Sequence, residues 1–408
     1  MRRVAGSSRP VARLRASEVA TERDAPDLGE SQHRLFTERR RSRPVWPQSL
    51  APGTGDGVTL YRFEDCARVL RNPQTFSSRG YEQGIDLVMG RTILSMDDPE
   101  HEIHRDLVAP AFHQRALTAW TGDVVGPVCE NLIDRFQLNE RAELVGDFCN
   151  EFPIRVTARM LGLPPDDHAQ FQRWSMELIG IAGDLETGFA ASGALRDYFA
   201  GIVSDRRHSP LRDVISDLVA AEIDGQHLSD EAIYSFLRLL LPAGVETTSR
   251  AIPALLLRLL THSDQLRDVL VDRTLVPGAI EESLRLDVPV VYISRLATRD
   301  AEIGGVPVPK GAFVTLCLAS ANRDESRWAE PDRFDIHRPF QQHLTFAAGP
   351  HMCLGQHVAR MEITVALNAL LDRLPGLRLD PDATASKLVH HGGGSMPALD
   401  SLPVLFDT

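Results

Sequence analysis

The sequence predicts a mainly helical fold with a small β part, and three observations carry that prediction. Apolar residues recur at helical spacing over long segments, for example between residues 124 and 136. Short apolar runs broken by Gly and Pro between residues 303 and 318 are typical of strands and turns. The segment from 229 to about 260 is apolar on most sides, which indicates a helix buried in the middle of the molecule.

The central helix has a clear start and is expected to be long. Ser229 is a suitable N-cap, and Asp230 and Glu231 follow where the helix dipole favours negative charge. Pro242 and Pro253 lie inside the pattern. Because the apolar pattern continues past both prolines, we expect them to bend the helix and not to end it.

The other elements follow one another along a single domain. No internal repeat, low-complexity segment or linker interrupts residues 45–408, so we expect one domain there. In order, we expect a strand at 58–61, a helix at 63–70, a helix from Pro277 through Arg285, short strands within 303–318, a loop over 322–344 and a last long helix at 355–374.

The N-terminal segment is basic. Residues 1–17 contain five arginines and no acidic residue. A transit peptide has a similar bias, but a disordered or loosely ordered basic tail over residues 1–44 fits the composition better.

Composition excludes two classes of partner. The 56 Asp and Glu residues outnumber the 44 Lys and Arg residues, for a net charge of -12. An acidic balance argues against a nucleic-acid binder, because phosphate contacts need a basic face. No apolar run approaches the ~20 residues of a membrane span. We therefore expect that the protein binds neither nucleic acid nor a membrane. We also expect a monomer, and its chain is long enough to bury a big planar cofactor.

The cysteines indicate a reducing environment. Five are present, they are far apart, and they form no CxxC pair. That pattern disfavours a disulfide framework and a structural zinc site, and it fits the cytoplasm. Four of them are expected to be buried as small apolar residues: Cys66, Cys129, Cys149 and Cys317.

Cys353 stands in a different setting. It lies in the loop Phe346-Ala-Ala-Gly-Pro-His-Met-Cys-Leu-Gly355, directly before a predicted helix. Unpaired backbone N–H groups and the helix dipole stabilise a thiolate there, and a thiolate can ligate a heme iron. Gly349 and Gly355 allow the backbone to approach a flat ring, and Phe346 can pack beside the sulfur.

This loop resembles the heme-binding signature of the cytochrome P-450 superfamily, in particular its soluble bacterial type. The family pattern is Phe, two residues, Gly, any residue, Arg or His, any residue, Cys, any residue, Gly, and every fixed point is met. Many bacterial members have Gly where Ala347 stands. The likeness extends over about residues 58–405. It implies the family fold, with heme b (iron protoporphyrin IX) between the central helix and the cysteine loop, and Cys353 as the metal ligand.

The resemblance also implies a buried structural network. Glu282 and Arg285 share a helix face, a spacing that alone means little because exposed helix ion pairs of this kind are common. Arg333, in Pro331-Asp-Arg-Phe334, matches a further position of the family's Glu-Arg-Arg network. These three charges are expected to lock the cysteine loop.

A polar pair interrupts the central helix at Ala243-Gly-Val-Glu-Thr-Thr248. A Thr hydroxyl can bond to the carbonyl one turn back and open the helix, and Ala243 leaves room for a ligand. One explanation of the polar residues is an internal hydrogen bond. The resemblance implies a sharper one, in which Thr247 steadies dioxygen and Glu246 supplies protons through water.

A third group of residues matches positions that bind the heme propionates in the family. His101 and Arg105 lie four residues apart on one helix face, and two cations there suit an anion. Arg295 and His351 match two further propionate positions. A zinc site at His101 and His104 is disfavoured, because the HExxH motif places its histidines four residues apart.

The expected function is that of a heme monooxygenase. The resemblance implies insertion of one atom of O2 into a C–H bond of a small hydrophobic substrate. Electrons from NAD(P)H are expected to arrive indirectly, through a separate ferredoxin and ferredoxin reductase, since no reductase domain is recognisable in the sequence. Candidate substrate-pocket residues are Leu94, Ala243, Gly244, Val290, Val291 and Met396.

Three alternatives remain open on the sequence alone. A heme-thiolate enzyme that isomerises its substrate or uses peroxide would need Cys353 but not Thr247. A heme sensor or carrier would keep the iron site and never turn over. A helical protein without heme would require every motif above to be coincidental.

Overall fold

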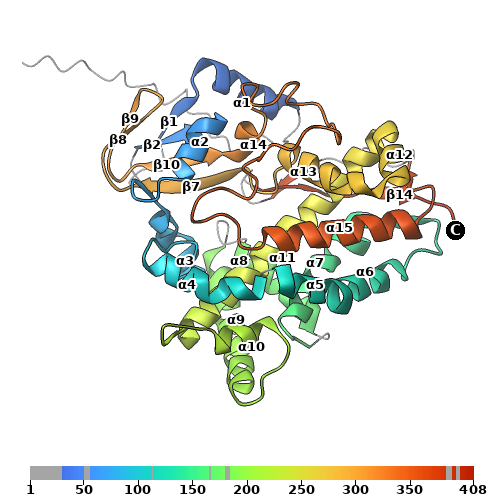
Figure 1. The fold of residues 1–408 in the computed structure, drawn as a ribbon, viewed down its shortest axis with the longest axis horizontal. Coiled ribbons are helices and arrows are strands. Elements are labelled where there is room, and N and C mark those ends of the chain that lie inside the picture. The colour runs from blue at the N-terminus through green and yellow to red at the C-terminus, as the bar shows by residue number, and fades with distance from the viewer. Residues whose placement is uncertain are drawn as a thin grey trace, which may run out of the picture.

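The computed structural model describes residues 30–49, 56–112, 114–164, 167–179, 184–382, 388–391 and 396–408. Those residues form a mainly helical molecule with one larger sheet and several short β pairs, as Figure 1 shows. This confirms the predicted fold class. Of the helices described, none combines the length and the apolar character needed to cross a membrane.

The larger sheet joins strands from distant parts of the chain. Its order is β1–β2–β10–β7–β3, and the parallel pair β2 and β10 brings Val58 beside Val314. The other neighbouring strands are antiparallel. The predicted strand at 58–61 corresponds to β2. The bounds are β1 (Val45–Ser49), β2 (Asp56–Leu60), β3 (Phe76–Ser77), β7 (Tyr292–Ala297) and β10 (Phe313–Cys317).

Helix α1 (Glu30–Ser42) belongs to the folded domain. Phe36 and Arg40 are buried, and Arg40 donates hydrogen bonds to the Glu325 carboxylate at 3.0 Å and to the Ser320 carbonyl at 3.2 Å. This differs from the loose tail expected over residues 1–44, because a buried arginine and a buried phenylalanine attach the helix to the domain. Residues 1–29 lie outside the described residues.

The central helix is α11 (Asp230–Thr261), and it has the predicted start. The Ser229 hydroxyl accepts a hydrogen bond from the Ala232 N–H at 3.2 Å. Pro242 and Pro253 lie inside the helix without ending it, as expected. The helix packs against α7 (Glu151–Met160), α8 (His168–Ile179), α9 (Leu185–His208), α12 (Ser263–Val271), α13 (Val276–Leu286) and α15 (Gln356–Arg373).

Shorter elements complete the fold. The predicted helix at 63–70 is confirmed as α2. The remaining helices are α2 (Phe63–Leu70), α3 (Ile85–Met89), α4 (Glu100–Val108), α5 (Gln114–Trp120), α6 (Gly126–Ile133), α10 (Val214–Ala220) and α14 (Leu318–Ala321). The remaining strands are β4 (Arg141–Glu143), β5 (Glu222–Ile223), β6 (Gln226–His227), β8 (Ala301–Ile303), β9 (Val306–Val308), β11 (Arg378–Leu379), β12 (Leu388–His391), β13 (Met396–Leu399) and β14 (Pro403–Leu405).

Two hydrophobic cores meet at the cysteine loop. One core is formed by the helices, and the other lies between the larger sheet and helices α2 and α14. Phe346 and Leu354 pack against the helical core, whereas Ala347 and Ala348 belong to the sheet side. The loop is therefore held from two sides before α15 begins.

Candidate active site

Cys353 occupies the setting that the sequence predicted. It precedes α15, and its backbone N–H donates to the Phe346 carbonyl at 2.9 Å. Burial raises the pKa of the Cys353 thiol, while the backbone N–H of Gly355 and the charge of Arg105 oppose that rise. Cys353 is nevertheless the one exposed cysteine of the five, all of which are free. The Cys353 side chain is therefore surrounded by protein, which desolvates the thiol, and is still reached by solvent.

The two loop glycines have different roles. Gly349 has φ of +73°, and a side chain on it would collide with the Leu70 carbonyl of α2. Its conformation therefore allows the close packing of this loop on α2. A side chain on Gly355 would meet nothing within 4 Å, so open space lies beside the residue that precedes α15.

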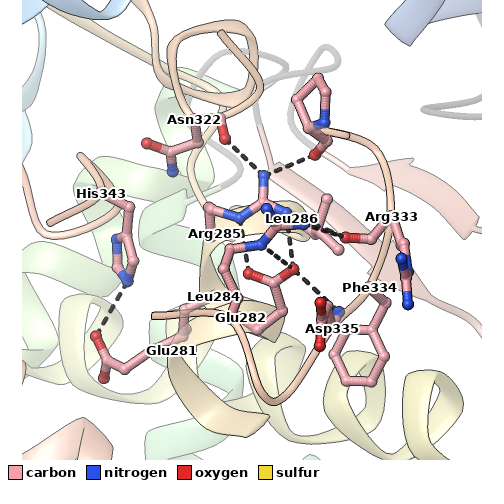
Figure 2. A network of polar contacts seen from close by, with 12 residues as sticks. Glu281, Glu282, Leu284, Arg285, Leu286, Asn322, Arg333, Phe334, Asp335 and His343 are labelled. Atoms are coloured by element: carbon pink, nitrogen blue, oxygen red, sulfur yellow. Dashed lines mark hydrogen bonds and ion pairs between the residues drawn. The ribbon is translucent and has the colours of Figure 1, made fainter. Parts of the chain in front are cut away.

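A buried ion pair stands behind this loop, and Figure 2 shows it. Arg285 on α13 donates Nε to Glu282 Oε2 and Nη2 to Glu282 Oε1, each at 2.8 Å. Its remaining nitrogen donates to the carbonyls of Asn322 at 2.9 Å and Pro331 at 2.7 Å. Both charged side chains are almost completely buried, and their hydrogen-bonding groups are satisfied.

The third charge of the network is Arg338, so the prediction of Arg333 was wrong. Arg338 donates Nε to Glu282 Oε1 at 3.1 Å, whereas the Arg333 side chain is exposed and pairs with the exposed Glu330. The turn in which the Arg333 N–H bonds to the Glu330 carbonyl leaves only the Arg333 carbonyl facing the network. A second arginine five residues further on was the signal available in the sequence.

The network reaches the cysteine loop through Asn322 and Thr345. Asn322 accepts from the Leu344 N–H at 2.7 Å and donates to Thr345 Oγ1 at 2.8 Å. Thr345 Oγ1 donates in turn to the Leu284 carbonyl at 2.7 Å. Since Thr345 directly precedes Phe346, α13 fixes the point at which the loop begins.

Four predicted cationic residues come together from three parts of the chain. His101 and Arg105 lie on α4, Arg295 lies on β7, and His351 lies in the cysteine loop. The rings of His101 and His351 are 4.0 Å apart, and Arg105 Nη2 donates to the Met352 carbonyl at 2.6 Å. Burial, together with His101, Arg295 and Arg105, lowers the pKa of His351 to about 3.

The positive charge of this cationic cluster comes from Arg105 and Arg295, because the lowered pKa leaves His351 neutral at neutral pH. Among the described residues, neither Arg105 nor Arg295 forms an ion pair with a carboxylate, although Arg295 is buried. His101 Nδ1 lies 3.1 Å from Asp98 Oδ1, but its buried Nε2 has no hydrogen-bond partner in the described part of the chain. Buried cations and an orphaned ring nitrogen suit an anionic ligand.

The central helix presents a small accessible surface in its middle. Ala243 is exposed and Gly244 and Thr247 are half-buried, although most of α11 is buried. Thr247 Oγ1 donates to the Ala243 carbonyl at 2.9 Å, which confirms the predicted bond to the preceding turn. An exposed alanine inside a central helix indicates space for a ligand beside it.

Glu246 lies in a different environment from Thr247. It is buried in an ion pair with Arg250, whose Nη1 also donates to the Met396 carbonyl at 3.2 Å. The sequence analysis missed Arg250, although a spacing of four residues on a helix indicates such a pair. At rest, the Glu246 carboxylate is therefore held by a cation.

The candidate pocket residues divide into two groups. Leu94, Gly244, Val290 and Met396 are half-buried, so they have accessible surface for a ligand. Val291 is fully buried in the sheet core, and its carbonyl accepts from the Leu318 N–H at 2.7 Å. Val291 is thus a packing residue, and the prediction that it lines a pocket was wrong.

The donors present fit an iron porphyrin. Such a group needs an axial ligand, space for a flat apolar ring and cations for its two carboxylates. Cys353 offers the ligand, and the surfaces at Gly355 and Ala243 offer space. In the cationic cluster, Arg105 and Arg295 offer the positive charge for the carboxylates, and His101 and His351 lie beside them.

Comparison with known proteins gives a consistent result. The family model described as cytochrome P-450 matches residues 184–376. The chain is 34% identical over 359 residues to cyclomarin C epoxidase CymV of Salinispora arenicola, covering 85% of this chain and 90% of that protein. It is 32% identical to a steroid C26-monooxygenase of Mycobacterium tuberculosis, covering 94% of this chain and 98% of the relative.

A solved structure supports the same relationship. The cytochrome P-450 PksS of the Bacillus subtilis bacillaene polyketide synthase superposes with a TM-score of 0.86 at 30% identity. The match covers 92% of this chain and 97% of the PksS chain.

Proposed function

The chain belongs to the cytochrome P-450 family of heme b monooxygenases, and we propose that it inserts one atom of O2 into a C–H bond of a small hydrophobic molecule. The observation that carries the proposal is one juxtaposition. A cysteine at a helix N-terminus lies in the same loop as His351, which packs on His101 in a cluster whose two arginines pair with no described carboxylate.

In this proposal Cys353 would hold the heme iron through its thiolate. When bound, heme b supplies the redox chemistry that activates O2, and a thiolate ligand favours cleavage of the O–O bond. Burial raises the pKa of the Cys353 thiol, and the backbone N–H groups of Gly355 and Gln356 oppose that rise and so favour the thiolate. The Glu282–Arg285–Arg338 network keeps the loop in place through Thr345.

The cationic cluster anchors the carboxylates of the cofactor. Arg295 is buried without an ion-pair partner among the described residues, and the buried His101 Nε2 has no hydrogen-bond partner there, so an anion would lower the cost of burying these groups. Arg105 reaches the Met352 carbonyl as well, and it ties the anchor to the cysteine loop. Phe346 packs in the same loop and limits the access of water to the sulfur.

We propose that Thr247, on helix α11, donates a proton or a hydrogen bond during the reaction. Its hydroxyl donates to the Ala243 carbonyl at rest, and a turn about χ1 lets Oγ1 donate to O2 in the space beside Ala243. Glu246 is the acid that resupplies protons through water. Because Glu246 is held by Arg250, its carboxylate must be released, or bridged by water, before it can serve Thr247.

The names of two relatives support a proposal for the kind of substrate. One relative is named an epoxidase of cyclomarin C and another a steroid monooxygenase, so we propose a hydrophobic substrate of comparable kind. The half-buried Leu94, Gly244, Val290 and Met396 would contact it. We further propose that a monomer works in the cytoplasm, with a ferredoxin and a ferredoxin reductase that pass electrons from NAD(P)H.

Turnover with surrogate partners tests the proposal. The purified protein is first screened for hydrophobic ligands by the spectral shift on binding, with testosterone as the first probe. Turnover of a binding ligand is then measured with a surrogate ferredoxin, its reductase and NADPH. We expect Thr247→Ala to bind the ligand normally but to yield about tenfold less product per NADPH. Thr248→Ala, next to it and buried, serves as the control.

Two outcomes would contradict the proposal. Thr247→Ala with unchanged coupling would remove Thr247 from the proton path. Turnover driven by hydrogen peroxide, with no activity from any ferredoxin, would favour a peroxide-using enzyme instead.

A further inference from the structure

Arg360 carries a positive charge whose position is tightly fixed. It lies on α15, seven residues after Cys353, and pairs with Glu281 on α13 through two bonds, Nε to Oε1 at 2.6 Å and Nη2 to Oε2 at 2.9 Å. Its third nitrogen donates to the Gln356 carbonyl at 3.3 Å and side chain at 3.2 Å. All three nitrogens are thus engaged, and the guanidinium has little freedom to move.

The same guanidinium lies against the cysteine loop. Its central carbon is 4.3 Å from the centroid of the Phe346 ring, and the Phe346 carbonyl accepts the Cys353 N–H. The ring therefore connects Arg360 to the segment that carries the sulfur. Of the two partners in this ion pair, it is Arg360 that packs on the Phe346 ring.

Glu281 is itself fixed as an anion. Although burial opposes it, hydrogen bonds from Arg360 and His343 lower the pKa of the Glu281 carboxyl to about 2. His343 Nε2 lies 3.2 Å from Glu281 Oε2, and His343 belongs to the segment before Phe346. The two side chains point toward each other (Figure 2). Because the acid stays ionised at neutral pH, Arg360 is held in place throughout the working range.

Arg360 has no part in the site described above. Arg105, the other cation near the sulfur, belongs to the cationic cluster and bonds to the Met352 carbonyl. Arg360 contacts the cysteine loop from the α15 side through the Phe346 ring, and a positive charge at this position favours negative charge on Cys353.

We propose that Arg360 is a positioning residue that tunes the Cys353 thiolate. A fixed cation against the cysteine loop would lower the electron donation of the sulfur and favour the reduced form of the iron, so it would raise the reduction potential of the enzyme. Glu281 and Phe346 hold the cation where it acts. The inference rests on the proposed ligation of iron by Cys353.

The reduction potential of the heme-loaded protein, titrated without any redox partner, tests the inference. We expect Arg360→Gln to shift the reduction equilibrium toward the oxidised form roughly three- to tenfold. A tenfold shift corresponds to about 59 mV for one electron. Arg360→Lys keeps the charge and is expected to stay close to wild type.

Arg273→Gln is the matched control. Arg273 also pairs with an acid across to α15, Asp372, at 2.8 Å, and its 32% exposed fraction is close to the 30% of Arg360. Its pair lies about 18 Å further along the helix. Removal of this charge is expected to leave the potential unchanged.

Three results would overturn the inference. The first is an unchanged reduction potential in Arg360→Gln. The other two are a shift in Arg360→Lys, or in Arg273→Gln, as large as the shift in Arg360→Gln. The carbon monoxide spectrum of the reduced wild-type protein, recorded first, separates this from the proposed function. A wild-type spectrum without thiolate ligation would refute the ligation itself, whereas normal thiolate ligation with no effect of Arg360→Gln would refute only the tuning.

Discussion

Two buried groups of charges lie on either side of the cysteine loop, and they differ in completeness. In the Glu282–Arg285–Arg338 network, one carboxylate faces two guanidinium groups, and backbone carbonyls accept their remaining hydrogens. In the cationic cluster, no carboxylate of the described residues forms an ion pair with Arg105 or with Arg295.

The difference separates a structural site from a binding site. A buried ion pair that is fully satisfied can hold a fold without a ligand. Buried cations without a counter-ion raise the free energy of the protein until an anion arrives. The first group therefore explains how the loop is held in place, and we propose that the second group binds the carboxylates of the heme.

Breaking the complete network should have the largest effect. Glu282→Gln leaves two buried guanidinium groups without their counter-ion, and we expect a loss of about 3–5 kcal/mol of unfolding free energy. Urea unfolding followed by circular dichroism measures this. Glu330→Gln, which removes an acid from an exposed pair, should cost less than about 0.5 kcal/mol. An equal loss of unfolding free energy in the two variants would mean that the buried network contributes no more stability than an exposed ion pair.

Substitution of one of the two candidate arginines, Arg338, should give the next largest effect. Arg338→Met removes one of the two cations on Glu282 and should cost about 2–3 kcal/mol, because part of the carboxylate loses its partner. Arg333→Met should cost less than about 0.5 kcal/mol, since its side chain is exposed. If Arg333→Met proved the more damaging variant in the same unfolding assay, the assignment of Arg338 would be incorrect.

The incomplete cluster should respond differently with and without its ligand. Arg295→Gln should speed transfer of heme to an acceptor protein about ten- to hundredfold, from the loss of about 1.5–3 kcal/mol of charged hydrogen bonding. The same change should leave the heme-free protein no less stable, because it removes a buried uncompensated charge. The exposed Arg299, four residues further on, gives the control Arg299→Gln. Equal destabilisation of both forms by Arg295→Gln would mean that Arg295 is structural.

The smallest expected effect lies in the loop between the two groups. Ala347 has φ of +57°, which is unfavourable for any residue with a side chain. Ala347→Gly should therefore raise the unfolding free energy by about 0.5–1 kcal/mol. Ala348→Gly, at the buried neighbouring position without a positive φ, should lower it. Thermal unfolding of both variants checks the sign.

The sequence predicted those parts of the site that depend on local pattern. Cys353 before a helix, Thr247 bonded one turn back and the pairing of Glu282 with Arg285 all follow from residues close together in the chain. Helix α11 was predictable because its cap and apolar pattern lie within it. The gathering of His101, Arg295 and His351 came from resemblance, since no local pattern places β7 beside α4.

Other features depended on tertiary contacts that no local pattern encodes. Arg333 and Arg338 stand in one irregular loop, and only its turns decide which of them faces inward. Val291 and Val290 are chemically identical, yet only Val291 is enclosed by the sheet core. For the same reason the sequence did not distinguish Gly349, which packs on α2, from Gly355, which borders open space.

The central claim is that Cys353 binds the heme iron as a thiolate, and one spectrum tests it most directly. The purified protein is reduced with dithionite, carbon monoxide is added, and the difference spectrum is recorded for the wild type and for Cys353→His. The account predicts the strongly red-shifted Soret band of a thiolate ligand in the wild type and its loss in the variant. A wild-type band at the position of histidine-ligated heme, or a red-shifted band that persists in Cys353→His, would contradict it.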